Sequence, residues 1–269
     1  MKWLSRSYTW VVMTFLYAPI LVLIAYSFNA NKSRGIWTGF TFHWYKELLG
    51  NSLIMQSLVN TLIIAVISSL LATLLGTMAA LGLHGMRGPS KSLIMNITYL
   101  PVINPEIVTG VSLMLLFVLF RLEFGFTTLI LAHITFNVPY VILNVLPKLR
   151  QMDPNLYEAA EDLGCPPVPS FFRVVLPEIA PGVITGLLMS FTFSLDDFII
   201  SYFVSGTTSQ TLPITIYSMT RKKVSPEINA LSAIIFVVVL VVLIIVNIND
   251  ARIEKKNRRK VGDSFEKKF

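Results

Sequence analysis

The 269-residue chain is far more hydrophobic than a soluble globular protein. Hydrophobic residues make up 54% of it and charged residues only 14%, with a mean hydropathy of +0.67. Soluble domains contain about 25% charged residues, so this composition predicts a membrane protein. The single cysteine, Cys165, excludes an intrachain disulfide. The net charge of +7 does not indicate nucleic-acid binding, because the basic residues flank apolar runs instead of forming a patch interleaved with aromatic residues.

Six apolar runs of membrane-spanning length predict an all-α, polytopic protein with six transmembrane helices. The first run, 9–28, is longer than the apolar core of a signal peptide and is followed by no convincing small-residue cleavage site, so we expect it to be retained. The other runs cover residues 57–83, 93–120, 126–146, 179–204 and 229–248. They leave no segment for a separate soluble domain, and residues 1–269 are expected to form one transmembrane domain.

The regions within and between these runs have distinct compositions. The run 57–83 is rich in Ser, Thr, Ala and Gly, which allow helices to approach closely in lipid. Pro101 and Pro105 predict a break in the third span, just before Glu106. The sequence HWYKELL, which includes Trp44, is typical of an interfacial helix. Residues 205–228 are expected to form a polar loop, and the charged tail 250–269 to be solvated or bound to anionic headgroups.

One long polar segment, residues 153–177, interrupts the apolar runs. Asp153 and Pro154 favour the start of a short helix, and Gly164 favours its end in a left-handed conformation. Later prolines end this helix, and a second short helix is expected to begin near Pro169. An apolar stripe runs along the first helix at Leu156, Tyr157, Ala160 and Leu163. A helix-turn-helix with such a stripe is suited to a groove in a soluble partner.

The same segment resembles the EAA loop of ATP-binding-cassette (ABC) importer permeases with the MetI-like, type I fold. The pattern is Glu158-Ala159-Ala160, then Gly164, then nine residues to Val174-Val175-Leu176-Pro177, with Val174 in place of the family's Ile. The resemblance implies that a cytoplasmic coupling loop, residues 147–177, docks on an ATPase. The residues assigned to this coupling are Glu158, Ala159, Ala160, Asp162, Leu163 and Gly164.

Further stretches resemble the spermidine/putrescine permeases within this family. They include His43-Trp44-Tyr45 and Phe193-Ser194-Leu195-Asp196-Asp197. The resemblance implies a substrate path that includes Trp44, Glu106, Ser194, Asp196 and Asp197. It also implies two copies of an ABC ATPase, a homologous permease subunit and an extracytoplasmic polyamine-binding protein as partners. The subgroup has an acid in the coupling loop where this chain has Pro167, which argues against a substrate-linked role at that position and leaves the expected ATPase docking unchanged.

Charge asymmetry predicts the orientation. Six spans place both termini and the coupling loop on one side, which carries 15 of the 22 Lys and Arg residues, eight of them in the tail. The positive-inside rule therefore predicts that this side is cytoplasmic. The resemblance to importer permeases implies that the membrane is a bacterial inner membrane.

The acidic residues within the spans are the strongest sequence evidence for the kind of solute that is transported. Glu106, Asp196 and Asp197 lie in spans that contain no Lys or Arg. A carboxylate in the hydrocarbon costs about 2.5–3.5 kcal/mol on insertion scales, so these acids should face a cavity or a partner. A transported cation could neutralise them, with Tyr140, Tyr202 or Phe203 offering aromatic faces. Adjacent residues point about 100° apart on a helix, so either one aspartate lines the path or the helix is broken there and both do. The alternative is that Ser, Thr or backbone groups satisfy these carboxylates between helices.

Catalytic and metal-binding signatures are absent from the sequence. It contains no phosphate-binding G-x-x-x-x-G-K-[ST] and no G-x-S-x-G, so we expect a non-catalytic subunit without a cofactor. His43, His84 and His133 lack metal-ligand spacing and are expected to be interfacial or packed. Two other functions remain open: a cation-coupled secondary transporter that uses these acids as a proton relay, and an importer permease for another cationic solute.

Overall fold

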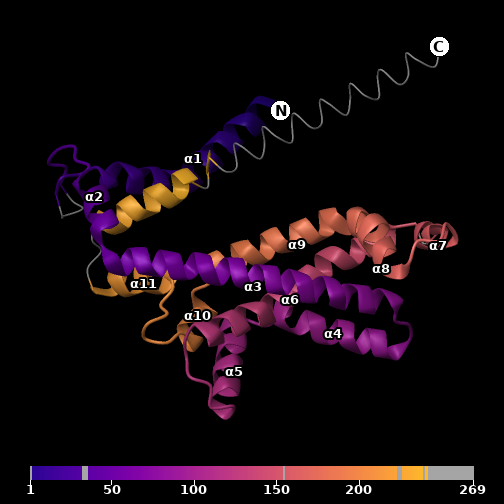
Figure 1. The fold of residues 1–269 in the computed structure, drawn as a ribbon. Coiled ribbons are helices and arrows are strands. Elements are labelled where there is room, and N and C mark those ends of the chain that lie inside the picture. Colours follow the sequence, from indigo (N-terminus) through magenta and orange to yellow (C-terminus); the bar gives the residue numbers. More distant parts are fainter. Residues whose placement is uncertain (1, 32–35, 154, 223–225, 239, 242–269) are drawn as a thin grey trace. The chain divides into compact units, whose positions relative to one another are not determined.

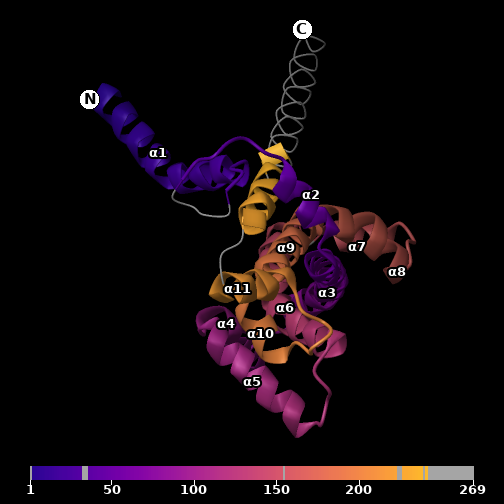
Figure 2. The ribbon, with the colours of Figure 1, turned by 90° about the vertical axis from the view of Figure 1, so that its left-hand side faces the viewer.

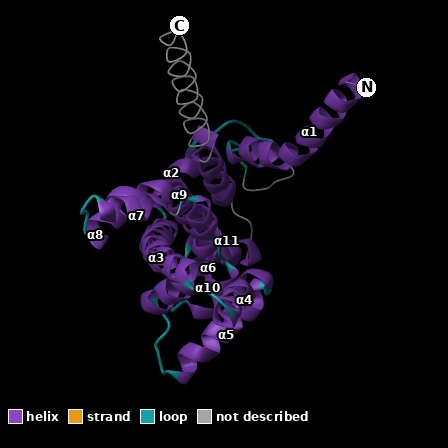
Figure 3. Cartoon of the chain, turned by 90° about the vertical axis from the view of Figure 1, so that its right-hand side faces the viewer, coloured by secondary structure: helices purple, strands orange, loops and turns teal. Residues whose placement is uncertain are grey.

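The computed structural model describes residues 2–31, 36–153, 155–222, 226–238 and 240–241. Helices account for most of this part of the chain, with loops between them and no strand drawn (Figure 3). By contact the chain divides into two units, one of residues 1–52 and 219–269 and the other of residues 53–218. The charged tail 250–269 lies outside the described residues.

The described helices confirm the all-α, polytopic prediction. Four are long and apolar enough to span a membrane, and the count rises to five if the bent pair α4–α5 forms one span. They are α1 (Lys2–Ser27), α3 (Ser52–Gly85), α6 (Phe126–Gln151) and the run from α8 to α9, Pro167–Asp196. The shorter helix Pro226–Val238 begins the expected sixth span, whose later residues are mostly outside the described part.

The first unit contains α1, α2 (His43–Gly50) and the helix Pro226–Val238. The described part of α1 is exposed along most of its length, as expected of a lipid-facing helix. Near Ser27 an aromatic cluster joins the end of α1 to α2; it consists of Phe28, Phe40, Phe42 and Tyr45. Asn51 also donates a hydrogen bond to the Glu227 carboxylate at 3.2 Å, which connects the end of α2 with the start of the last described helix.

The second unit is a bundle around α3, α6 and α9 (Leu176–Asp196), as Figure 1 shows. Glycines allow the three helices to meet at Val141 of α6. A Cβ on Gly76 of α3 would lie 2.6 Å from the Val141 Cβ, and one on Gly186 of α9 would lie 3.2 Å from the Val141 Cα. A Cβ at Gly76 would clash with Val141, and one at Gly186 would require Val141 to shift, which confirms close approach by small residues in the second span.

The third span is broken as the two prolines predicted. α4 (Pro89–Ile103) and α5 (Glu106–Leu119) meet at an angle of 108°. Pro105 precedes α5 and cannot donate a backbone hydrogen bond, while Asn104 is extended with ψ 144°. α5 points away from α3, α6 and α9 (Figures 1 and 2).

The expectation of a polar loop over 205–228 is wrong for its central part. Residues Leu212–Lys222 form α11. Thr61 of α3 accepts a hydrogen bond from the Leu212 backbone N–H at 2.7 Å, and the Ser57 and Thr215 hydroxyls lie 2.6 Å apart. These contacts with α3 bury one face of a segment that is only weakly apolar overall. Tertiary packing therefore stabilises a helix that composition alone does not indicate.

Candidate functional site: an acidic pocket at a helix break

A second break, between α9 and α10 (Ile199–Val204), creates the polar centre of the bundle. α9 ends at Asp196, and Asp197 is extended with ψ 118°. The break leaves the first N–H groups of α10 without intrahelical partners. The Asp197 carboxylate accepts hydrogen bonds from the backbone N–H groups of Ile200 at 3.2 Å and Ser201 at 2.7 Å, and from the Ser201 hydroxyl at 2.7 Å. Asp197 therefore caps α10.

The two adjacent aspartates have different surroundings. Asp197 is 9% exposed and its oxygens are occupied by α10, whereas Asp196 is exposed. The helix is broken between α9 and α10, which is one of the two arrangements that the sequence left open for these aspartates. Both aspartates line the same pocket, but only Asp196 has a carboxylate open to it.

This pocket has a volume of about 420 Å³. Glu106, the first residue of α5, and Asp196, the last residue of α9, supply its exposed carboxylates. Aromatic side chains form much of the remaining wall, and the Tyr140 and Phe193 rings lie 4.6 Å apart. The full lining is Pro101, Glu106, Thr109, Phe136, Tyr140, Phe193, Asp196, Asp197, Phe198, Ile199 and Ile200.

No Lys or Arg lines the pocket, and no ion pair with Glu106 or Asp196 occurs in the described ranges. The described part of the chain also contains no cluster of three His, Cys, Asp or Glu side chains that could hold a metal. Exposed carboxylates beside aromatic rings suit an organic cation, which pairs with the charge and packs on the rings.

Two of the predicted path residues lie elsewhere than on the pocket wall. Ser194 is buried one turn before the break, where its hydroxyl accepts a hydrogen bond from Asn137 Nδ2 at 2.8 Å and lies 3.1 Å from the Ser68 hydroxyl. It thus connects α9 with α6 and α3. Trp44 belongs to the first unit, where it is 2% exposed and its indole donates to the Asn29 carbonyl at 2.6 Å.

His133, expected to be interfacial or packed, makes a specific buried contact. His133 is fully buried, and its Nε2 lies 3.0 Å from the Ser201 hydroxyl and 3.5 Å from Asp197 Oδ2. His133, Asn137 and Tyr140 are spaced i, i+4 and i+7, which places them on one face of α6. This polar and aromatic stripe in an apolar span is a sequence signal that could have indicated the α6 face directed at the site.

The predicted coupling segment has the expected helix and helix end. The short helix is α7 (Asn155–Asp162), and Asp153 Oδ1 accepts a hydrogen bond from the Asn155 N–H at 2.9 Å. Gly164 has φ +77°, and the Cys165 N–H donates to the Ala160 carbonyl at 3.0 Å, as in a Schellman end. The second helix begins at Pro167, slightly before the expected position, and continues through a π-helical stretch, Phe171–Val175, into α9.

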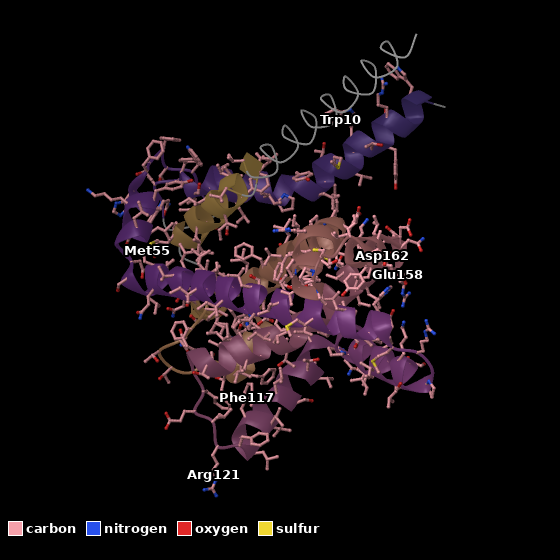
Figure 4. The ribbon with its side chains drawn as sticks, turned by 45° about the vertical axis from the view of Figure 1, so that its right-hand side comes forward. Trp10, Met55, Phe117, Arg121, Glu158 and Asp162 are labelled. Atoms are coloured by element: carbon pink, nitrogen blue, oxygen red, sulfur yellow. The ribbon has the colours of Figure 1, made fainter. Side chains whose placement is uncertain are left out.

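The coupling residues lie largely on the surface of α7. Glu158 and Asp162 are exposed and point outward from this helix (Figure 4). Leu163 is 89% exposed, an unusual state for a leucine at the end of a short helix. Tyr157, in contrast, packs against the hydrophobic core that includes Leu149 and Val175. One face of α7 is therefore attached to the bundle, and the other remains open.

Comparison with known proteins identifies the family. Residues 72–259 match the model of the binding-protein-dependent transport system inner membrane component. The chain belongs to this family. It is 36% identical to the spermidine/putrescine transport system permease protein PotC of Haemophilus influenzae, over 90% of this chain and 94% of that protein. It is 41% identical to the putrescine transport system permease protein PotI of Escherichia coli strain K12, over 92% and 91%.

Solved structures of ABC importers share the fold. A bacterial ABC transporter that imports the acidic polysaccharide alginate aligns with a TM-score of 0.71 at 13% identity, covering 91% of this chain and 93% of that one. The same kind of transporter in complex with its alginate pentasaccharide-bound periplasmic protein aligns with a TM-score of 0.67 at 18% identity, covering 91% and 90%. The family and these structures together confirm a MetI-like permease subunit of an ABC importer.

Proposed function

We propose that this permease subunit forms, with a homologous permease subunit, the path by which spermidine or putrescine enters the cytoplasm. The pocket at the α9–α10 break carries the proposal, because it combines two exposed carboxylates with an aromatic wall. Relatives named as spermidine/putrescine and putrescine permeases match nearly the whole chain and support the same cargo.

The chemistry of the pocket favours a polyamine over other solutes. A polyamine carries ammonium groups separated by methylenes, so it requires spaced negative charges and apolar surface between them. Glu106 and Asp196 line the pocket from two different helices, α5 and α9, and its wall also includes Tyr140 of α6 and Phe193 of α9. An acidic cargo would be repelled by these carboxylates, and an uncharged one would leave them without a counter-ion.

Within this path we assign the cargo contacts to Glu106 and Asp196. Asp197 contributes negative charge but uses its hydrogen-bonding capacity on α10, and Ser194 joins three helices behind the wall. Trp44 remains a predicted path residue, with its indole N–H committed to Asn29.

For coupling, we propose that the exposed face of α7 docks on a cytoplasmic ABC ATPase, present in two copies. An extracytoplasmic polyamine-binding protein delivers the cargo on the opposite side. ATP binding closes the ATPase pair, α7 transmits that movement, and the path alternates between outward and inward access. In this arrangement residues 1–269 form one transmembrane domain with a cytoplasmic coupling segment, 147–177, a cytoplasmic tail, 250–269, and both termini in the cytoplasm.

Uptake by cells that express the assembled transporter tests the proposal. Glu106→Gln and Asp196→Asn should each lower the initial rate of radiolabelled spermidine uptake about tenfold, since a charge-assisted contact contributes about 1.5–3 kcal/mol. Undiminished uptake in both variants would mean that the path lies elsewhere.

Two further measurements separate the alternatives. A cation-coupled secondary transporter would lose uptake with a protonophore while ATP is maintained, whereas the proposed importer would keep it. Glu158→Ala should lower uptake while leaving the amount of folded protein unchanged, because Glu158 is exposed on α7.

A further inference from the structure

The site contains a buried hydrogen-bonded chain of three residues, of which Asp197 lines the pocket while His133 and Ser201 do not. It runs from His133 on α6 through the Ser201 hydroxyl to the Asp197 carboxylate. His133 and Ser201 are fully buried. Together with the two backbone N–H groups bound by Asp197, this chain attaches the start of α10 to α6.

The direction of each hydrogen bond follows from the groups involved. A hydroxyl has one proton, and the Ser201 hydroxyl donates it to Asp197 Oδ2 at 2.7 Å. At 3.0 Å from His133 Nε2, the same oxygen must therefore accept, so Nε2 carries a proton. His133 Nδ1 is buried and has no hydrogen-bond partner among the described residues.

We propose that His133 is a positioning residue of the substrate path: as a hydrogen-bond donor through Nε2 it holds Ser201 and Asp197, and so sets the start of α10. The position of Asp197 affects cargo binding because its neighbours in the sequence line the pocket. Asp196 immediately precedes the residue that is held, and Ile199 and Ile200 line the pocket.

This inference rests on the proposed function, and its test uses a quantity that does not depend on the amount of transporter. That quantity is the ratio of initial rates for spermidine and putrescine, measured in cells that express the assembled transporter. Fewer folded molecules lower both rates equally. A displaced Asp196 changes its distance to Glu106 and therefore affects two cations of different length differently.

His133→Leu removes the donor and retains an apolar side chain, whereas His133→Gln retains an N–H donor near the Nε2 position. We expect His133→Leu to change the ratio about threefold or more, on the scale of one lost hydrogen bond, and His133→Gln to restore most of the wild-type ratio. Ser201→Ala interrupts the chain at its middle and should change the ratio in the same direction as His133→Leu. Ser57→Ala is the matched control, since it removes a buried hydroxyl contact with Thr215 away from the pocket and should leave the ratio unchanged.

Each outcome has one meaning. If His133→Leu does not accumulate in the membrane, the Ser201→Ala ratio decides: a changed ratio supports the inference and a wild-type ratio overturns it. A wild-type ratio in His133→Leu, or a Gln variant as altered as the Leu variant, also overturns it. If instead Glu106→Gln and Asp196→Asn leave both rates intact, the proposed function fails, whereas loss of uptake in those variants with a normal ratio in His133→Leu removes only the role of His133.

Discussion

The break between α9 and α10 and the end of α7 are both polar helix ends, but they use their polar groups in opposite ways. At the break, the buried carboxylate of Asp197 is occupied by α10 and only Asp196 remains open. At the end of α7, the backbone closes on itself through Gly164 and Cys165, while Glu158, Asp162 and Leu163 remain exposed. Under the proposed function, the break is organised in advance for a small ligand, whereas α7 presents a surface for a partner protein.

The largest expected effect comes from reversing the open charge at the break. Asp196→Lys places a cation where the cargo's ammonium group should bind, and like charges at close range cost several kcal/mol, so spermidine uptake should fall about 100-fold. Asp196 is exposed, so the amount of folded protein should stay close to that of the wild type. Uptake and an immunoblot of the membrane fraction measure the two quantities. Retained uptake at normal abundance would contradict the assignment of Asp196 to the cargo.

A smaller but still large effect is expected from removing the Asp197 carboxylate, which caps α10 next to Asp196. Asp197→Ala leaves the N–H groups of Ile200 and Ser201 and the Ser201 hydroxyl without their acceptor, at a cost of about 1–3 kcal/mol for such buried groups. Its thermal midpoint in detergent should therefore fall by several degrees. Asp197→Asn keeps an oxygen acceptor and should lie between Ala and the wild type. Equal midpoints for Ala and the wild type would show that Asp197 does not hold α10.

These contrasts show what the sequence could and could not predict. Local sequence signals were sufficient to predict two features. The break before Glu106 follows from two prolines in one span, and the end of α7 follows from Gly164 after an apolar stripe. The difference between Asp196 and Asp197 depends on Ser201 and on His133, 64 residues before Asp197 in the chain. α11 was missed for the same reason, since its burial depends on Ser57 and Thr61 of α3. Long-range pairing is not encoded in a local pattern.

At α7, changing the helix end should produce a moderate effect of a different kind. Gly164 has φ +77°, a left-handed conformation that costs roughly 1–2 kcal/mol for other residues, so Gly164→Val should fray the last turn. Uptake should fall severalfold for spermidine and putrescine alike, because the pocket is unaffected. A changed ratio between the two polyamines would contradict the separation of the two regions. The comparison variant is Gly50→Ala, because Gly50 has negative φ and free space around its Cβ position.

The smallest effect on the stability of the isolated chain is expected for a substitution of Leu163. The same substitution should lower uptake, so it distinguishes a loss of coupling from a loss of stability. Leu163 is 89% exposed, so Leu163→Ser removes almost no buried apolar area and should change the free energy of unfolding by less than about 0.5 kcal/mol. Its thermal midpoint in detergent should match the wild type. Uptake should nevertheless fall, because a leucine exposed at a helix end is expected to be buried by the docked ATPase. Val168→Ser, at another exposed apolar residue four positions after Gly164 and within α8, shows whether any loss of exposed apolar surface has the same effect. Normal uptake in Leu163→Ser would mean that the ATPase contacts a different face of α7.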